Sequence, residues 1–215
     1  MRLPRREGDD DIVPLGHAVA GGILVMIPRG DYFQCGYVVP KGGAEALQAK
    51  GLEAFKRSIE AIAPELRGRC GVLTSWGDVK LLTVAVDRLK TWCAPGVLCI
   101  GDAAHAMSPI GGVGINLAVQ DAVASANLLW SPLKAGSVSL ADLAAVQRRR
   151  QWPTEVTQGA QVFIQNRMIA PLLAGSSPKA PWPAKVVDRV PFLQGLTARI
   201  LGLGVRFEKV HAPAA

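Results

Sequence analysis

One segment near the middle of the chain, residues 97–129, limits most strongly what this sequence can fold into. It begins with a short apolar run, Val97–Ile100, which predicts a strand buried on both faces, as found inside an α/β sheet. The run stops at Gly101-Asp102, and a Gly- and Pro-rich loop over about 103–113 leads to a predicted helix over about 114–130. A strand, a glycine-rich loop and a helix in this order are typical of a ligand site at the carboxyl end of a sheet.

The chemistry of this segment favours a ligand that carries hydroxyl groups and negative charge. Gly101 has no side chain, so a ligand can approach the backbone closely. Asp102 would place a carboxylate at the edge of the sheet, where it is suited to accept hydrogen bonds from a polyol or a ribose. The glycine-rich loop ends where a helix starts, and the first backbone N–H groups of a helix, at the positive end of its dipole, form an anion site.

The residues GDAAHAMSPIGGVGINLAVQDA, which start at Gly101, strongly resemble the second FAD-binding motif of the flavoprotein aromatic hydroxylases, the p-hydroxybenzoate hydroxylase-like family. The segment MIPRGDYFQCGYVVPKG is similar, more weakly, to the start of that family's substrate-side sheet. The resemblance implies an FAD-dependent monooxygenase. In such an enzyme NADH or NADPH reduces FAD, and a flavin C4a-hydroperoxide hydroxylates an aromatic or quinone-like small molecule.

The resemblance also implies roles for individual residues of the loop. Asp102 would accept a hydrogen bond from the ribityl chain of FAD, and Pro109 would lie beside the isoalloxazine ring. The backbone N–H groups of Ile115 and Asn116 would meet the N1–C2=O2 edge of the flavin, where a helix N-terminus stabilises negative charge. The predicted cofactor-binding residues are Gly101, Asp102, Pro109, Gly111, Gly112, Val113, Gly114, Ile115 and Asn116. No side chain is predicted to be catalytic, and the spacing of the cysteines and histidines predicts no metal site.

Other polar side chains in and near the motif have plainer interpretations. His105 is predicted to be a structural loop residue and not an acid or a base. Asp121 is predicted to be a packing or capping partner within the helix. Asn116 either caps the helix through its side chain or meets the flavin, and the sequence leaves both open. Arg29 and Lys41 are expected at the surface.

The fold expected from these observations is α+β and lacks one familiar element. Gly112-Val113-Gly114 begins like the dinucleotide fingerprint G-x-G-x-x-G, but Leu117 stands at the third position and a loop precedes it. The N-terminal Rossmann βαβ unit that holds the ADP part of FAD in the family is absent from this sequence. We expect an antiparallel substrate-side sheet with one helix over 1–90, the second FAD-binding motif over 91–131, as the C-terminal part of an FAD-binding α/β domain, and a basic helical tail over 132–215.

Three functional hypotheses remain open at this point. The first is that the chain is the C-terminal half of a flavoprotein monooxygenase. The second is that it is a truncated or split fragment, inactive alone. In either case we expect weak or no retention of FAD by this chain alone. The third is a non-hydroxylating FAD oxidoreductase of the same superfamily; a halogenase is disfavoured because the sequence has no W-x-W-x-I-P motif.

Hydrophobic periodicity predicts the remaining elements of the chain. Two β-rich runs on either side of a Gly-Asp turn predict an antiparallel hairpin over 22–28 and 32–39. The other expected elements are a helix over 44–63, two strands within 71–89, a helix over 139–170 bent or interrupted at Pro153, and a last amphipathic helix over 184–203.

The net charge is confined to the last third of the chain. Residues 148–215 hold 10 of the 24 basic side chains and 3 of the 17 acidic ones, so the whole excess of +7 lies there. This distribution predicts a solvated helical face and disfavours nucleic acid as a partner. The alternative is that Arg148, Arg149 and Arg150, with the basic and apolar residues that follow, contact an anionic membrane surface. We expect a cytoplasmic protein, membrane-associated under that alternative; substrate and oligomeric state stay open.

Overall fold

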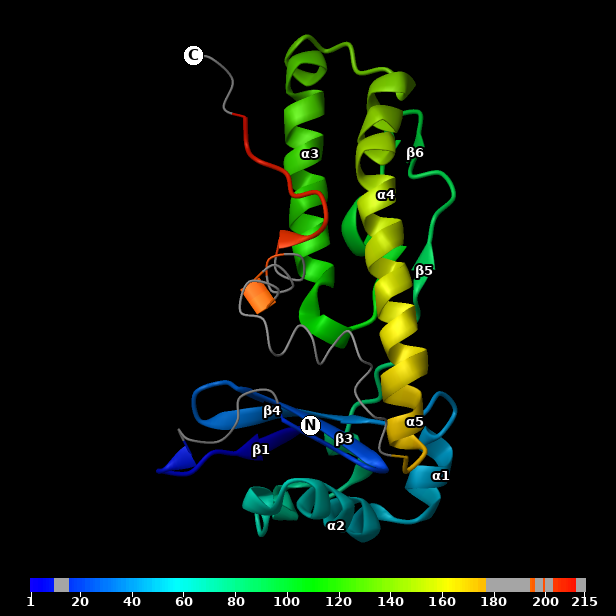
Figure 1. The fold of residues 1–215 in the computed structure, drawn as a ribbon. Coiled ribbons are helices and arrows are strands. Elements are labelled where there is room, and N and C mark those ends of the chain that lie inside the picture. The colour runs from blue at the N-terminus through cyan, green and yellow to red at the C-terminus, as the bar shows by residue number, and fades with distance from the viewer. Residues whose placement is uncertain (10–15, 177–193, 196–198, 200–202, 212–215) are drawn as a thin grey trace. The chain divides into compact units, whose positions relative to one another are not determined.

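The computed structural model describes residues 1–9, 16–176, 194–195, 199 and 203–211, and the chain divides into two compact units (Figure 1). The first unit is Met1–Thr83 with Asn166–Lys179, and the second is Val84–Gln165 with Ala180–Ala215. Every strand pairing in the described part of the chain is antiparallel, and long helices accompany the strands. The expected α+β class is confirmed.

The first unit is built on a four-stranded antiparallel sheet in the order β1-β4-β3-β2. The expected hairpin is confirmed, because β3 and β4 pair with Val25 opposite Gly36. Gly30 supplies the positive φ of 76° that the turn between them requires. The four strands are β1 (Arg2–Pro4), β2 (His17–Val19), β3 (Gly22–Pro28) and β4 (Tyr32–Val38).

One face of this sheet is covered by a helical segment that is broken in two. The expectation of one helix over 44–63 was wrong: the structure has α1 (Ala44–Ala49) and α2 (Leu52–Ile62). Gly51 separates them, because its φ of 85° and ψ of 156° lie outside the helical region. The buried core of the unit consists of Leu3, Leu24, Met26, Phe33, Cys35, Phe55, Ile59, Ile62, Ala63, Leu66, Cys70 and Leu73.

The segment after α2 forms tight turns where two strands were expected within 71–89. Three 3₁₀ turns occur, at Pro64–Leu66, Cys70–Val72 and Trp76–Asp78. The Asp78 carboxylate accepts the backbone N–H groups of Thr74 and Ser75 at 2.9 and 3.0 Å, so local side-chain bonds replace a strand ladder here. From the expected second strand only β5 (Asp87–Arg88) remains.

The second unit contains two long helices, α3 (Gly114–Lys134) and α4 (Leu140–Ile164), which pack side by side (Figure 1). The capping box of Ser139 and Asp142 starts α4. Beside the helices run short segments with little regular structure: β5, β6 (Cys93–Ala94), β7 (Val97–Leu98), the 3₁₀ turn Gly101–Ala103, β8 (His105–Ala106) and the 3₁₀ turn Ile110–Gly112. The apolar cluster of this unit contains Leu129, Leu143 and Val146, packed against Cys93, Leu98 and Ile100.

Three details of the second unit differ from the sequence-based expectations. The run 97–100 is not a strand buried on both faces: only Val97–Leu98 is a strand, it pairs antiparallel with β6, and Val97 is 55% exposed. Helix α3 continues through Pro132. Pro153 does not interrupt α4, which ends at Ile164 and is followed by a π-helical turn and α5 (Ala170–Leu173).

The expected last helix over 184–203 lies mostly outside the described residues. Among the helices that the structure describes, none has the length and apolar character needed to span a membrane.

We predict that Phe55→Ala lowers the free energy of unfolding of the first unit by about 3–5 kcal/mol. Phe55 is 1% exposed and packs against the rings of Tyr37 and Trp76, at centroid distances of 5.2 and 5.4 Å. Leu82→Ala is the control, since Leu82 is 79% exposed and should change stability by less than about 0.5 kcal/mol. Urea denaturation followed by circular dichroism measures both; equal losses would contradict the packing described here.

Candidate functional site

The segment singled out in the sequence forms one continuous loop that ends at the start of α3. Gly101 opens it with a φ of 58° and is buried; a Cβ at this position would lie 3.0 Å from the Cβ of Ala118. Glycine is therefore required both for the backbone conformation and for the close approach of the loop to Ala118 on α3. Asp102 follows in an exposed 3₁₀ turn, with its carboxylate at the surface.

The loop enters α3 through two successive glycines with left-handed backbone. Gly111 and Gly112 have φ values of 78° and 64°, both are exposed, and a Cβ on Gly112 would meet no atom within 4 Å. Within the described residues, no side chain caps α3 at Val113 and no carboxylate lies in its first turn. The start of α3 thus presents backbone N–H donors and the positive end of the helix dipole beside an open, glycine-lined surface.

The structure places the predicted cofactor-binding residues at different depths around this helix start. Val113 is buried, and Gly114 lies against Met107, whose Cβ is 3.3 Å from the position of a Cβ on Gly114. Five of the nine are exposed, namely Asp102, Pro109, Gly111, Gly112 and Ile115, whereas Gly114 and Asn116 are half-buried. The hollow between the helix start, α4 and residues 204–205 measures about 120 Å³. That is below the roughly 300–1,000 Å³ of ligand pockets, so this hollow alone is too small for a large cofactor.

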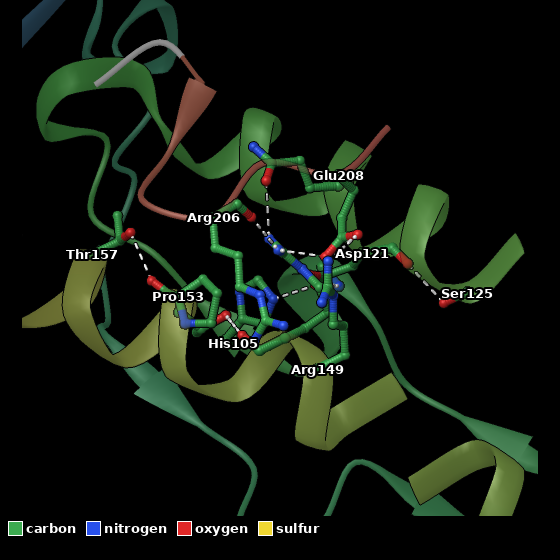
Figure 2. Close-up of polar contacts among 12 residues, drawn as sticks. His105, Asp121, Ser125, Arg149, Pro153, Thr157, Arg206 and Glu208 are labelled. Atoms are coloured by element: carbon green, nitrogen blue, oxygen red, sulfur yellow. Dashed lines mark hydrogen bonds and ion pairs between the residues drawn. The ribbon is translucent and has the colours of Figure 1, made fainter. Parts of the chain in front are cut away.

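A buried carboxylate on α3 holds the first part of the loop (Figure 2). Asp121 is 0% exposed, and its Oδ2 accepts the backbone N–H of Gly101 at 3.0 Å. The same oxygen lies 2.5 Å from Nε2 of His105, which is also buried. The other oxygen, Oδ1, accepts from Nε of Arg150 on α4 at 2.9 Å. One side chain therefore joins the loop to both long helices.

Arg150 extends this network to the last described segment of the chain. It is 0% exposed and donates from Nη1 to the carbonyl oxygen of Arg206 at 2.9 Å and from Nη2 to Gln120 at 3.3 Å. Glu208 lies 3.5 Å from Arg150 and is bound by Arg149 through two bonds of 2.7 and 3.1 Å. Buried charges are tolerated when they are paired and hydrogen-bonded in this way.

The electrostatic environment keeps Asp121 ionised. Burial by itself would raise the pKa of the Asp121 carboxyl, but the hydrogen bonds from His105, Arg150 and the Gly101 N–H outweigh burial and hold the pKa below its usual value. His105 points at this carboxylate and not at the surface, which agrees with the structural role expected for it.

The structure does not place Arg148, Arg149 and Arg150 on one surface, as the membrane alternative required. Arg148 is exposed, but Arg150 is fully buried, and Arg149 is engaged with Glu208. The side chains of three successive arginines on a helix point in three different directions, because successive residues are about 100° apart around the helix axis. Most of the residues that were to complete this surface, among them Lys185 and Arg189, lie outside the described part of the chain.

Sequence reasoning missed the polar face that α4 turns toward the loop. Nε2 of Gln158 donates to the carbonyl oxygens of Asp87 and Ala106 at 2.9 and 3.0 Å. Nε2 of Gln161 donates to the carbonyl oxygen of Ser108 at 2.8 Å. A signal was available: polar residues recur at helical spacing along the buried side of α4, at Gln147, Arg150, Thr154, Gln158 and Gln161.

Comparison with known proteins shows that the chain is similar to FAD-binding proteins. Residues 2–160 match the family model of an FAD binding domain. The chain is 38% identical over 184 residues to 6-methylpretetramide 4-monooxygenase of Streptomyces rimosus, covering 84% of this chain and 44% of that protein. It is 39% identical over 80 residues to the FAD-dependent monooxygenase atmM of Aspergillus flavus, covering 36% of this chain and 17% of that protein.

Solved structures share the fold. PqsL from Pseudomonas aeruginosa superposes with a TM-score of 0.60 and 24% identity, covering 80% of this chain and 47% of that one. CmlS, a flavin-dependent halogenase, gives a TM-score of 0.55 at 18% identity, covering 99% of this chain and 40% of that one. The chain spans less than half the length of these relatives.

We predict that Arg150→Ala lowers the free energy of unfolding of the second unit by about 3–5 kcal/mol, because it leaves the buried Asp121 carboxylate without its cation. Arg148→Ala, a matched change two positions away at an exposed site, should cost less than about 0.5 kcal/mol. Urea denaturation compares the two variants. Similar stabilities would show that the buried pair does not hold the unit together.

A second prediction concerns acid stability. Because the folded-state pKa of Asp121 lies below its unfolded value of about 3.9, the ionised carboxylate stabilises the fold above that pH, and the contribution is lost as the pH falls through the folded-state pKa. Asp121→Asn cannot titrate. The difference in free energy of unfolding between the wild type and this variant should therefore shrink below about pH 4. Urea denaturation over a pH series measures it, and a difference that stays constant down to about pH 3 would argue against the assignment.

Proposed function

The chain belongs to the FAD-binding monooxygenase family, and from this premise we propose that it supplies the ribityl- and pyrimidine-binding part of an FAD site. The proposed enzyme hydroxylates an aromatic or quinone-like small molecule and takes its electrons from NADH or NADPH. Because the chain spans less than half of its relatives, the complete reaction would also need the parts of the family fold that these residues do not include.

The observation that carries the proposal is the open start of α3. The exposed Gly111 and Gly112 leave room for a flat ring system against the backbone, since neither has a side chain. The N–H donors of the first turn, with no capping side chain at Val113 and no carboxylate in that turn, suit the N1–C2=O2 edge of a flavin. That edge becomes negative on reduction, so the helix dipole favours the reduced cofactor without a charged side chain.

Two exposed residues of the loop would complete the contact with FAD. Asp102 presents a carboxylate that accepts hydrogen bonds from the hydroxyls of the ribityl chain. Pro109 presents a rigid apolar surface, without an N–H group, to one side of the ring. The donor and acceptor set of the loop therefore fits the polyol and the pyrimidine ring of a flavin.

The chemistry itself belongs to the cofactor, which when bound would accept electrons from reduced nicotinamide and deliver them to dioxygen. The residues of this chain bind and orient FAD. His105 is not proposed as a proton donor to substrate, because it is 1% exposed and its Nε2 faces Asp121. Hydroxylation is proposed because 6-methylpretetramide 4-monooxygenase is 38% identical over most of the chain. The similarity to the halogenase CmlS, at 18% identity, concerns the fold alone.

Titration with FAD and with FMN, followed by quenching of flavin fluorescence, tests this proposal. Because the proposed contacts involve the ring and the ribityl chain, FMN should bind with an affinity comparable to that of FAD, and ADP should not compete. Asp102→Asn should weaken the binding of both flavins by about tenfold or more, the loss expected for a hydrogen bond to a charged group.

Asp31→Asn is the matched control, since Asp31 is exposed in the β3–β4 turn of the other unit and should leave flavin binding unchanged. The proposal fails if neither flavin binds at about 1 mM, which corresponds to a binding free energy of only about −4 kcal/mol. Competition by ADP, or equal binding by the wild type and the Asp102 variant, would also contradict it.

A further inference from the structure

We propose that Asp121 is a positioning residue of the flavin site, which sets where Asp102 stands relative to the first turn of α3. The inference rests on the proposed function for the meaning of those two contacts. We call the two bonds of Asp121 to Gly101 and His105 the clamp. Both bonds lie within this chain, so the clamp is testable without the cofactor.

The first argument is that one oxygen atom holds the loop on both sides of Asp102. Oδ2 of Asp121 accepts the N–H of Gly101, the residue before Asp102, at 3.0 Å. It also accepts from Nε2 of His105, three residues after Asp102, at 2.5 Å. The exposed Asp102 therefore lies in a short stretch, residues 101–105, whose first and last residues both bond Oδ2 of Asp121.

The side chain of His105 is committed to this bond. It is 1% exposed and lies against the ring of Trp92 at a centroid distance of 5.1 Å. No described residue bonds its Nδ1, so the contact with Asp121 is the polar interaction that the structure gives this ring. A histidine buried in this way acts as a tether for the loop, because moving the loop would leave the buried Nε2 without a partner and would remove one hydrogen bond from Oδ2 of Asp121.

The second argument is that the clamp and the proposed amide donors share one rigid helix. Asp121 follows Asn116 by five residues, which is a rise of about 7.5 Å along α3. Within one helix this separation does not change. By holding the short stretch that carries Asp102, Asp121 fixes the distance between the acceptor for the ribityl chain and the N–H donors for the pyrimidine edge, and this is the distance that a bound flavin must span.

The third argument concerns the charge of the clamp. A carboxylate has about four acceptor sites, and Asp121 uses one oxygen for the loop and the other for Arg150. An asparagine has only one acceptor oxygen, so Asp121→Asn turns an N–H donor toward either the loop or Arg150 while it preserves the volume. The substitution therefore tests the bonds and not the packing.

Hydrogen–deuterium exchange on the cofactor-free chain tests the clamp. In Asp121→Asn we expect the Gly101 amide to exchange at least about tenfold faster than in the wild type, with the change confined to the loop and its contacts. The control is Asp142→Asn, which removes a carboxylate from the exposed capping box of α4 and should alter exchange only at the start of that helix. Unchanged exchange at Gly101, or a uniform increase over the whole unit, would overturn the clamp.

A second variant keeps the test decisive if Asp121→Asn does not fold. His105→Phe retains an aromatic ring beside Trp92 and leaves the Asp121–Arg150 pair intact, but removes the tether after Asp102. It should also speed exchange within the loop, whereas exchange equal to that of the wild type would contradict the role given to His105.

A double-mutant cycle on FMN affinity separates positioning from a general loss of structure. Because Asp121 is proposed to act through Asp102, Asp121→Asn should weaken FMN binding in the wild-type background and have much less effect when Asp102→Asn is already present. Equal effects in both backgrounds would contradict the coupling. If the wild type binds no FMN, the proposed function fails, and the exchange experiment still decides whether Asp121 clamps the loop.

Discussion

Asp121 and Arg150 are both fully removed from water, and the rest of the second unit is arranged around the pair that they form. A carboxylate or a guanidinium alone at this depth would be strongly unfavourable, so neither can stay without the other. Because Asp121 stands on α3 and Arg150 on α4, the pair determines how the two helices face each other. Its remaining hydrogen bonds bring in Gly101 from the loop and the Arg206 carbonyl from the last described segment.

The second unit has polar side chains in its interior because the segments beside its two long helices have little regular secondary structure. The strands between residues 84 and 113 are only two residues long, so much of the backbone there has no ladder partner. Buried backbone N–H and C=O groups must nevertheless be paired. Helix α4 meets this need with side chains: Gln147 bonds the Trp92 N–H, and Gln158 and Gln161 bond the carbonyls of Ala106 and Ser108.

What could be predicted from the sequence was local. The β3–β4 hairpin and the glycine-rich entry to α3 were predicted correctly, because turn residues and hydrophobic periodicity act over a few positions. The first of the two strands within 71–89 was predicted wrongly, since the Asp78 side chain captures backbone N–H groups that a ladder would need, and of the second only β5 forms. The burial of Arg150 could not be inferred from its neighbours Arg148 and Arg149, because it depends on Asp121, 29 positions away.

The glutamine bonds of α4 affect which positions can change in sequence, on the helix and in the segment over residues 87–108 that it supports. The bonds that the Nε2 groups of Gln147, Gln158 and Gln161 donate to this segment end on main-chain carbonyls, at Asp87, Lys90, Ala106 or Ser108, and every amino acid offers the same carbonyl. The side chains of the loop can therefore diversify without losing this support. The constraint falls on the helix, where a shorter or apolar residue at Gln158 would leave two carbonyls unpaired at once. A segment with little regular structure is thus kept in shape by the sequence of a helix about 50 to 70 residues further along the chain.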